Sequence, residues 1–228
     1  MILRLNDIAM VAADTTRTKY YLQKLIDSDL LPSYVILLLN NKTLPLPGQK
    51  KHNSSEELID LLERSSIPYC IAPDSDINSN KVIATISNRA ESVFIFSGFG
   101  GVLLGDEVLG LGKRFLHIHG GYLPDYKGST TNYYSLINEK SIGASSIFLT
   151  KDIDCGPILF RRKFPPPKDC TKIDHIYDSK ARSEVLIETL KKYVCYGSWN
   201  FDFKDNLNGE TYYIIHPVLK HIAILGGK

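Results

Sequence analysis

The apolar residues in the first half of the chain follow two alternating patterns. Short, nearly continuous apolar runs are typical of strands that are buried on both faces. Segments 15–31 and 53–66 instead carry apolar side chains at helical spacing, with Thr and Ser residues at their starts that suit helix caps. The strand candidates are residues 7–13, 34–40, 68–72, 92–97 and 114–119. Strands that alternate with helices predict an α/β fold with a doubly wound, mostly parallel sheet.

The second half of the chain continues with two predicted strands, 142–150 and 156–164, and a long amphipathic helix over 175–194. The pattern changes at residue 196, where aromatic and polar residues mix. In this tail, "NGETYYI" is a turn-and-strand pattern, and "HIAIL" is a second apolar run that suits the other half of a hairpin. The sequence therefore predicts a main domain over residues 1–195 and a small C-terminal β-hairpin appendage over 196–228.

The composition narrows the class of protein. The chain has 228 residues, of which 43% are hydrophobic and 23% charged, as in globular proteins. A net charge of +2 gives no field that favours a nucleic acid or a membrane as partner. No apolar run is long enough for a membrane span, and the N-terminus lacks the pattern of a signal peptide. The four cysteines contain no CxxC pair, so we expect a cytoplasmic protein with reduced thiols and no zinc framework.

Two of the six histidines lie one residue apart in the run that ends "HIHGG". On a strand, His117 and His119 project from the same face, with their Cα atoms roughly 6.6 Å apart along the axis. Asp154 precedes a glycine turn and another predicted strand. A carboxylate beside an imidazole sets the tautomer of the ring and raises its basicity, which suits a general base. The pattern alone is also consistent with a metal site, or with structural histidines that are hydrogen-bonded in the core.

The order of "HIH", "LPDYKG" and "IDCGPIL" resembles the formyltransferases that use 10-formyltetrahydrofolate. These include glycinamide ribonucleotide transformylase, methionyl-tRNA formyltransferase and the sugar N-formyltransferases. The resemblance covers roughly residues 7–165 and implies a Rossmann-like catalytic domain over 1–195. His119 and Asp154 fall on the catalytic histidine and aspartate of the family. The motif loop matches at Pro124, Tyr126 and Gly128.

One position departs from the family pattern, because His117 stands where the family has an asparagine that stabilises the oxyanion. An imidazole N–H can also donate a hydrogen bond there, so the resemblance implies three catalytic residues. His119 is expected to accept the proton of the attacking amine, while Asp154 holds its tautomer. His117 is expected to donate a hydrogen bond to the formyl oxygen.

The resemblance also implies which residues bind the two substrates. The folate cosubstrate is expected against a glycine-rich turn and the turn that carries Asp154, namely Ser97, Gly98, Phe99, Gly100, Gly101, Val102, Leu103, Ile153 and Asp154. The expected substrate-binding residues are Arg17, Lys127, Thr130, Thr131, Tyr133 and Tyr134. Three of these assignments have structural alternatives. The glycine-rich turn Ser97–Gly101 also suits a plain tight turn. The segment around Arg17 also suits an ordinary helix cap, and Thr130–Tyr134 also suits a helix start with inward-facing tyrosines.

In its small size, the chain is most similar to sugar N-formyltransferases of the pseudaminic-acid type. The resemblance therefore implies formyl transfer to the amine of a nucleotide-linked deoxyamino sugar, without a metal, as in the biosynthesis of bacterial surface glycans. Three alternatives remain open: a non-catalytic folate or nucleotide-sugar binding module, a formyltransferase for glycinamide ribonucleotide or methionyl-tRNA, and a metal-dependent hydrolase. The apolar tail further suggests a homodimer.

Overall fold

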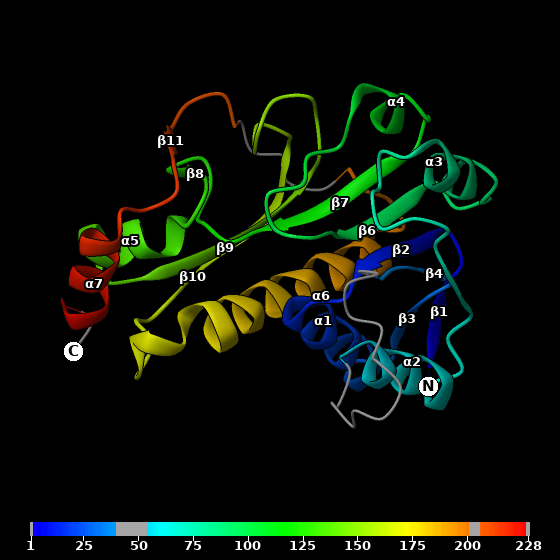
Figure 1. The fold of residues 1–228 in the computed structure, drawn as a ribbon, viewed down its shortest axis with the longest axis horizontal. Coiled ribbons are helices and arrows are strands. Elements are labelled where there is room, and N and C mark those ends of the chain that lie inside the picture. The colour runs from blue at the N-terminus through cyan, green and yellow to red at the C-terminus, as the bar shows by residue number, and fades with distance from the viewer. Residues whose placement is uncertain (1, 40–53, 201–205, 227–228) are drawn as a thin grey trace. The chain divides into compact units, whose positions relative to one another are not determined.

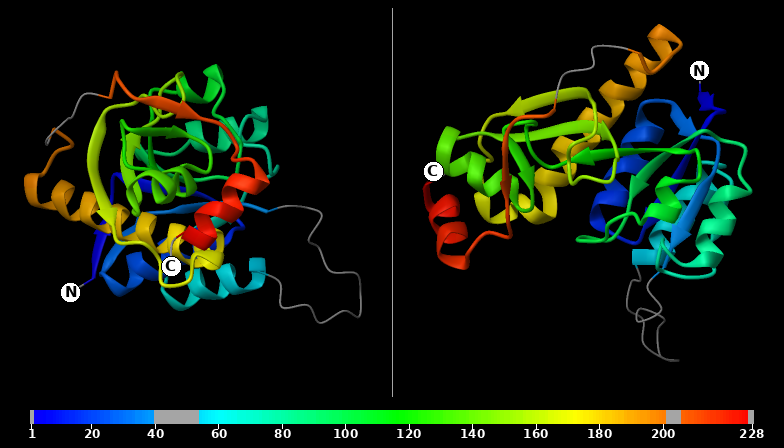
Figure 2. Two further views of the ribbon diagram at one scale, coloured as in Figure 1. Left: turned by 90° about the vertical axis from the view of Figure 1, so that its left-hand side faces the viewer. Right: turned by 90° about the horizontal axis from the view of Figure 1, so that it is seen from above.

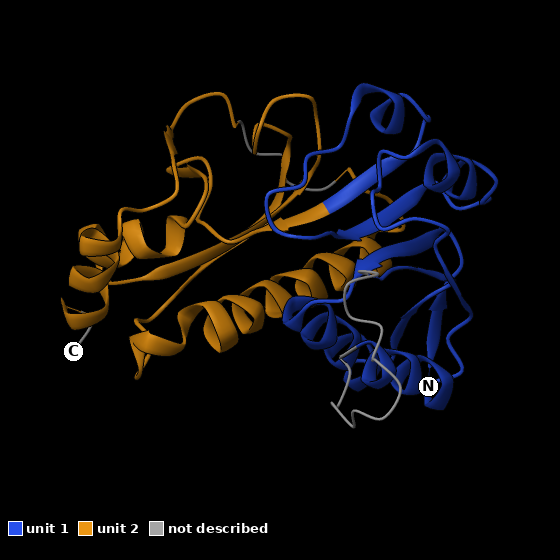
Figure 3. Cartoon of the chain, in the orientation of Figure 1, with its two compact units in different colours: residues 1–116 blue, residues 117–228 orange. Residues whose placement is uncertain are grey.

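The computed structural model describes residues 2–39, 54–200 and 206–226, and it divides into two compact units (Figure 3). Unit 1 comprises Met1–Leu116 and unit 2 comprises His117–Lys228. The division falls inside a strand, far from residue 195. The boundary expected there, between the main domain and the small C-terminal appendage, stays a prediction. Residues 40 and 53, at the edges of two predicted elements, lie outside the described residues.

Unit 1 alternates strands and helices, as the hydrophobic pattern predicts (Figure 1). Its elements are β1 (Leu3–Leu5), β2 (Ile8–Ala13), α1 (Thr16–Asp27), β3 (Leu30–Pro32), β4 (Val35–Leu38), α2 (Ser54–Arg64), β5 (Tyr69–Ile71), α3 (Asn80–Ser87), β6 (Val93–Ser97), α4 (Asp106–Leu109) and the first half of β7 (Arg114–His119).

The strands of unit 1 lie in the order β7-β6-β2-β4-β5. The pairs β6-β2, β2-β4 and β4-β5 are all parallel, which confirms the parallel sheet expected for this half. Every residue of β2, β4 and β6 is buried, since helices cover both faces. Helices α1 and α2 lie on one side of these strands and α3 on the other (Figure 1). The doubly wound fold is therefore confirmed.

The chain builds β2, β4 and β5 in one direction and then returns to place β6 on the other side of β2. Ligands in such sheets bind beyond the carboxyl ends of the strands at this reversal. The two strand ends there are tied together, because Thr18 Oγ1 lies 2.9 Å from Ser97 Oγ and donates to the Ala13 carbonyl at 2.6 Å. Thr15 is the N-cap of α1 and accepts from the Thr18 amide, so the expected cap is confirmed.

Unit 2 contains the second half of β7 and a longer set of elements. These are β8 (Tyr126–Gly128), α5 (Thr131–Glu139), β9 (Ile142–Phe148), β10 (Ile158–Phe164), a 3₁₀ turn (Cys170–Lys172), a π turn (Ile173–Tyr177), α6 (Asp178–Tyr196), β11 (Glu210–Tyr212) and α7 (Pro217–Gly226).

The strands of unit 2 lie in the order β10-β9-β7, and β10 runs antiparallel to β9. The fold is therefore mixed, with parallel strands in unit 1 and an antiparallel pair here. Helix α6 packs on both β9 and β10, and it buries Val185, Leu186 and Leu190 against them. The long helix predicted over 175–194 corresponds to α6 and the π turn before it.

The C-terminal appendage is a strand and a helix, so the expected β-hairpin is wrong. β11 pairs in parallel with β8, and "HIAIL" lies in α7, which packs against α5 (Figure 2). The less exposed residues of α7 are Lys220, Ala223 and Ile224, at the i, i+3, i+4 spacing of a helix. A strand would have turned Ala223 and Ile224 to opposite faces. Pro217 at the first helical position also favours a helix.

Among the residues that the structure describes, no helix has the length and apolarity needed to cross a membrane.

The packing of α7 leads to a stability prediction. Ala223→Glu places a carboxylate at a position where the side chain is 2% exposed. We expect the free energy of unfolding to fall by about 2 kcal/mol, or roughly 4–8 °C in Tm, because a buried charge without a partner is costly. His221→Glu, on an exposed position of the same helix, is the matched control and should leave Tm within about 1 °C. Equal losses in the two variants, measured by thermal denaturation, would contradict this packing.

Candidate active site

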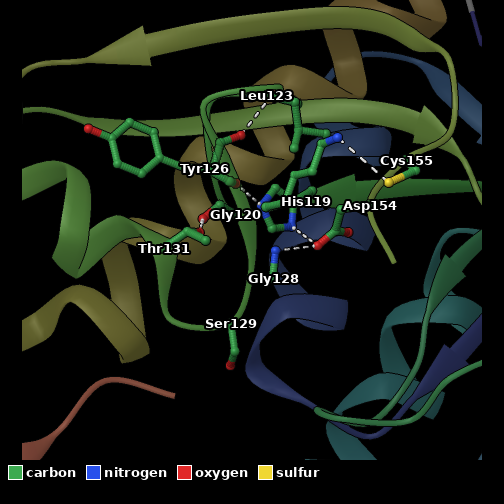
Figure 4. Close-up of polar contacts among 12 residues, drawn as sticks. His119, Gly120, Leu123, Tyr126, Gly128, Ser129, Thr131, Asp154 and Cys155 are labelled. Carbon is green, nitrogen blue, oxygen red and sulfur yellow. Dashed lines mark hydrogen bonds and ion pairs between the residues drawn. The ribbon is translucent and has the colours of Figure 1, made fainter. Parts of the chain in front are cut away.

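His119 is the last residue of β7, and its side chain meets Asp154 in unit 2 (Figure 4). The distance from His119 Nδ1 to Asp154 Oδ2 is 3.3 Å. Both residues are buried, with 4% of His119 and 8% of Asp154 exposed. The expected proximity of the two side chains is confirmed. It arises because β9, whose end leads into the Asp154 turn, is the neighbour of β7 in the sheet.

Asp154 sits in the turn between β9 and β10 with a left-handed backbone, φ 53°. Its carboxylate also accepts a hydrogen bond from the Gly128 amide at 2.8 Å. Burial raises the pKa of the Asp154 carboxyl, but the charge and hydrogen bond of His119 and the N–H of Gly128 outweigh burial and hold that pKa well below its usual range. The carboxylate is therefore ionised at neutral pH.

The second ring nitrogen of His119 also faces an acceptor. Nε2 lies 2.8 Å from the backbone oxygen of Tyr126, and a carbonyl oxygen can only accept. Nδ1 faces the ionised carboxylate of Asp154, which also only accepts. Both ring nitrogens therefore face protein acceptors, and each can donate to its oxygen when it carries a proton. A ring held in this way is placed to take part in proton transfer.

His117 lies two residues earlier on β7 and is partly buried. One potential ligand atom from each of His117, His119 and Asp154 lies within 4.8 Å of the others, so the three side chains that the sequence singles out do cluster. A metal ion needs a lone pair from each ligand. Both ring nitrogens of His119 face protein oxygens here, while the three side chains are also spaced as potential metal ligands.

Lys127, expected to bind substrate, lies inside unit 2 with 3% of its surface exposed. Its ammonium group donates to the backbone oxygen of Asn206 at 2.6 Å and lies 3.6 Å from Cys155 Sγ (Figure 4). The sequence reading missed Asn206, whose side-chain amide contacts the Asp154 turn. It follows that turn by 52 residues, and no motif marks it.

Thr131, Tyr133 and Tyr134 belong to α5, so the segment is a helix start, which was the structural alternative. Thr131 donates to the Gly120 carbonyl, and Tyr134 lies against the ring of Tyr212 at 4.5 Å. Burial, with the nearby charge of a carboxylate, raises the pKa of the Tyr133 hydroxyl. These contacts leave the binding role of the three residues a prediction.

A cavity of about 170 Å³ opens beside His119 within unit 2. It is mostly polar, and His119 belongs to its lining. Thr130 contributes to it, as do the two carboxylates of Asp174 and Asp178. Its lining is His119, Gly120, Gly128, Thr130, Thr131, Asn132, Tyr133, Ile173, Asp174, Asp178 and Arg182.

The expected folate residues Ser97–Leu103 begin at the carboxyl end of β6 in unit 1, where the strand order reverses. Arg17, from the first turn of α1, donates to the Gly98 carbonyl and, over 3.3 Å, to Ser97 Oγ. Arg17 therefore contacts this turn, and its expected role in substrate binding stays a prediction. Val102 and Leu103 are 36% and 63% exposed. Ile153, in unit 2, is 50% exposed. The folate-binding role expected of these residues stays a prediction.

Comparisons with known proteins show what the chain is similar to. The chain is 32% identical over 124 residues to a methionyl-tRNA formyltransferase of Thermotoga neapolitana, which is 54% of this chain and 36% of that protein. It is 27% identical over 140 residues to a formyltetrahydrofolate deformylase of Bacillus subtilis, 58% of this chain and 44% of that one. The matches thus span less than half the length of these curated relatives.

The fold is shared with a sugar N-formyltransferase of a Shewanella species, at a TM-score of 0.59 and 17% identity, over 96% of this chain and 87% of that one. The family model described as "Formyl transferase" matches residues 8–187, which include β2, the glycine-rich turn, His119 and Asp154. On this match the chain belongs to the formyl transferase family.

Proposed function

We propose that this chain transfers a formyl group from 10-formyltetrahydrofolate to the primary amine of a nucleotide-linked deoxyamino sugar. The observation that carries the proposal is the buried pair of His119 and Asp154, 3.3 Å apart, within the region that matches the family. The folate donor is supported by the relatives named formyltetrahydrofolate deformylase, and the sugar by the neighbour named sugar N-formyltransferase.

The pair of His119 and Asp154 suits both proton transfers that formyl transfer requires. The amine nitrogen forms a bond to the formyl carbon, whose oxygen becomes an oxyanion. The N–H of His117 lies on the same strand face and donates to that oxygen. His119 takes the proton that the attacking amine releases. It then gives a proton to the nitrogen of the donor as the bond of that nitrogen to the formyl carbon breaks, so charge and protons balance.

Asp154 stabilises the positive charge that the His119 ring carries during this exchange. Because its carboxylate stays ionised and is fixed by the Gly128 amide, it need not take up the proton itself. The acceptor amine would enter from the cavity beside His119, whose carboxylates and hydroxyls suit an amine and sugar hydroxyl groups. We place the reaction in the cytoplasm, in keeping with four cysteines that are all free.

A second candidate function is hydrolysis of the folate donor, because several relatives are named deformylases. In that reaction water replaces the amine, and the same histidine–aspartate pair moves the protons. The two functions differ in their products, since hydrolysis releases formate in the absence of any amine.

The proposed reaction can be tested directly. Full-length protein with 10-formyltetrahydrofolate and a panel of nucleotide-linked amino sugars should yield an N-formyl product, detected by mass spectrometry as a gain of one formyl group. Treatment with a chelator should leave the rate unchanged, because we assign no step to a metal. Formate release without any acceptor would favour the hydrolase, and inactivity only after chelation would favour a metal site. If only glycinamide ribonucleotide or methionyl-tRNA is formylated, the sugar is the wrong acceptor.

A further prediction separates the two histidines. His117→Asn restores a neutral hydrogen-bond donor and should keep turnover within about tenfold of the parent protein. His119→Asn removes the ring that exchanges protons and should lower turnover by roughly 10²–10⁴. Steady-state rates near neutral pH with saturating substrates make the comparison. If both variants lose activity equally, His117 does more than donate one hydrogen bond.

A homodimer is also part of the proposal. On α7 the side chains of Val218, Ile222 and Leu225 are 59%, 51% and 53% exposed, at the i, i+4, i+7 spacing of one helical stripe. An apolar stripe of this kind suits pairing with a second copy. Light scattering at micromolar concentration should give the mass of a dimer, and Ile222→Glu should shift it to that of a monomer. A monomeric parent protein would remove this part of the proposal.

A further inference from the structure

The segment Asn206–Tyr212 lies beyond residues 8–187, the part of the chain that matches the family. We propose that Asn206 is a positioning residue, and that its segment holds Asp154 and His119 in their reacting geometry. This inference rests on the proposed function, which assigns the reaction to that pair. It gives the C-terminal appendage a role in the site.

The side-chain amide of Asn206 binds the Asp154 turn directly. Its Nδ2 group donates to the backbone oxygen of Asp154 at 2.6 Å and to that of Gly156 at 2.7 Å. Asn206 is 3% exposed, so water does not compete for these bonds. The turn needs such support, because Asp154 adopts a left-handed backbone that is unfavourable for a residue with a side chain. The amide therefore fixes the backbone from which the carboxylate projects.

Lys127 connects the same segment to the motif loop. It lies on β8, between Tyr126 and Gly128, and its ammonium group donates to the Asn206 backbone oxygen. The ammonium also lies 3.6 Å from Cys155 Sγ in the Asp154 turn. One buried cation thus ties the motif loop, the turn and the C-terminal segment together. This explains why a lysine of the motif loop is buried instead of facing the substrate.

The strand β11 pairs with β8, which supplies the other contacts of His119 and Asp154. Its residues Glu210 and Tyr212 lie opposite Tyr126 and Gly128 in a parallel register. Tyr126 supplies the carbonyl that binds His119, and Gly128 supplies the amide that binds Asp154. The C-terminal segment therefore lies against the backbone groups that orient both members of the pair.

Close packing makes this docking specific. Gly128 has φ +93°, and a Cβ atom there would lie 2.1 Å from the Tyr212 oxygen. Gly209 has φ +116°, and a Cβ atom there would lie 1.8 Å from the Pro124 oxygen. Only glycine fits at these two positions, so the motif loop and the segment approach each other as closely as two backbones can.

A positioning role and a merely structural role predict different kinetics. If Asn206 sets the geometry of the pair, Asn206→Ala should lower kcat by about 10–100-fold and leave KM for both substrates within about twofold, since small misplacements of catalytic groups slow the chemical step. If Asn206 only supports the fold, Tm falls while the kcat of the folded fraction stays near the parent value. Asn208→Ala, on an exposed asparagine two residues away, is the matched control and should change neither quantity.

A second readout does not depend on turnover. In protein labelled with ¹⁵N-histidine, the His119 ring should show a slowly exchanging N–H proton, held by Asp154 or by the Tyr126 carbonyl. His119→Asn identifies its signal. Asn206→Ala should speed its exchange by at least about tenfold, and Asn208→Ala should not. If the parent protein transfers no formyl group, the proposed function fails, while the ring proton still tests the positioning role.

Lys127→Met serves as the second variant in case Asn206→Ala does not fold, with Lys180→Met on an exposed lysine as its control. It should reproduce the loss of kcat and the faster ring exchange, because it removes the cation that anchors the segment. Unchanged kcat and unchanged ring exchange in a folded Asn206→Ala or Lys127→Met protein would overturn the inference. A rise in KM without a fall in kcat would overturn it as well, since that result indicates substrate binding.

Discussion

The contact between the imidazole of His119 and the carboxylate of Asp154 constrains most of unit 2. A carboxylate and an imidazole that are almost fully buried lose their hydration, so each needs hydrogen-bond partners inside the protein. The pair therefore persists only where each remaining polar atom has a partner. The Gly128 amide and the Tyr126 carbonyl meet this need, and both belong to β8. The short strand β8 thus aligns the pair.

The same constraint fixes the orientation of the histidine ring. Nδ1 faces the carboxylate of Asp154 and Nε2 faces the Tyr126 carbonyl, so the ring is held from both sides. The sequence led us to expect a base at His119, and that role stays a prediction.

Sequence predicted the parts of the fold that depend on local pattern. Buried runs such as Ile8–Ala13 and Val93–Ser97 are strands, and Thr15 caps α1. The order of the histidines, the loop and the aspartate in the sequence led us to expect that His119 and Asp154 lie together. The pattern did not separate strand from helix in α7, because short apolar runs fit both. It also did not show that Leu30–Pro32 leaves the first helix to pair with β1, since that pairing is set by a distant segment.

Asn206 and Lys127 show why the remainder of the site could not be predicted from the sequence. Each acts through backbone carbonyls, which every residue type carries, so neither the residue nor its spacing identifies the partner. A buried lysine also runs against the expectation that a charged residue in a motif loop faces solvent or substrate. Its burial is tolerated because the Asn206 oxygen and the Cys155 sulfur receive the ammonium group. Burial of that charge requires the C-terminal segment to be in place, and the segment in turn supplies the amide that holds Asp154. The catalytic motifs and the tail beyond them therefore form one hydrogen-bonded arrangement.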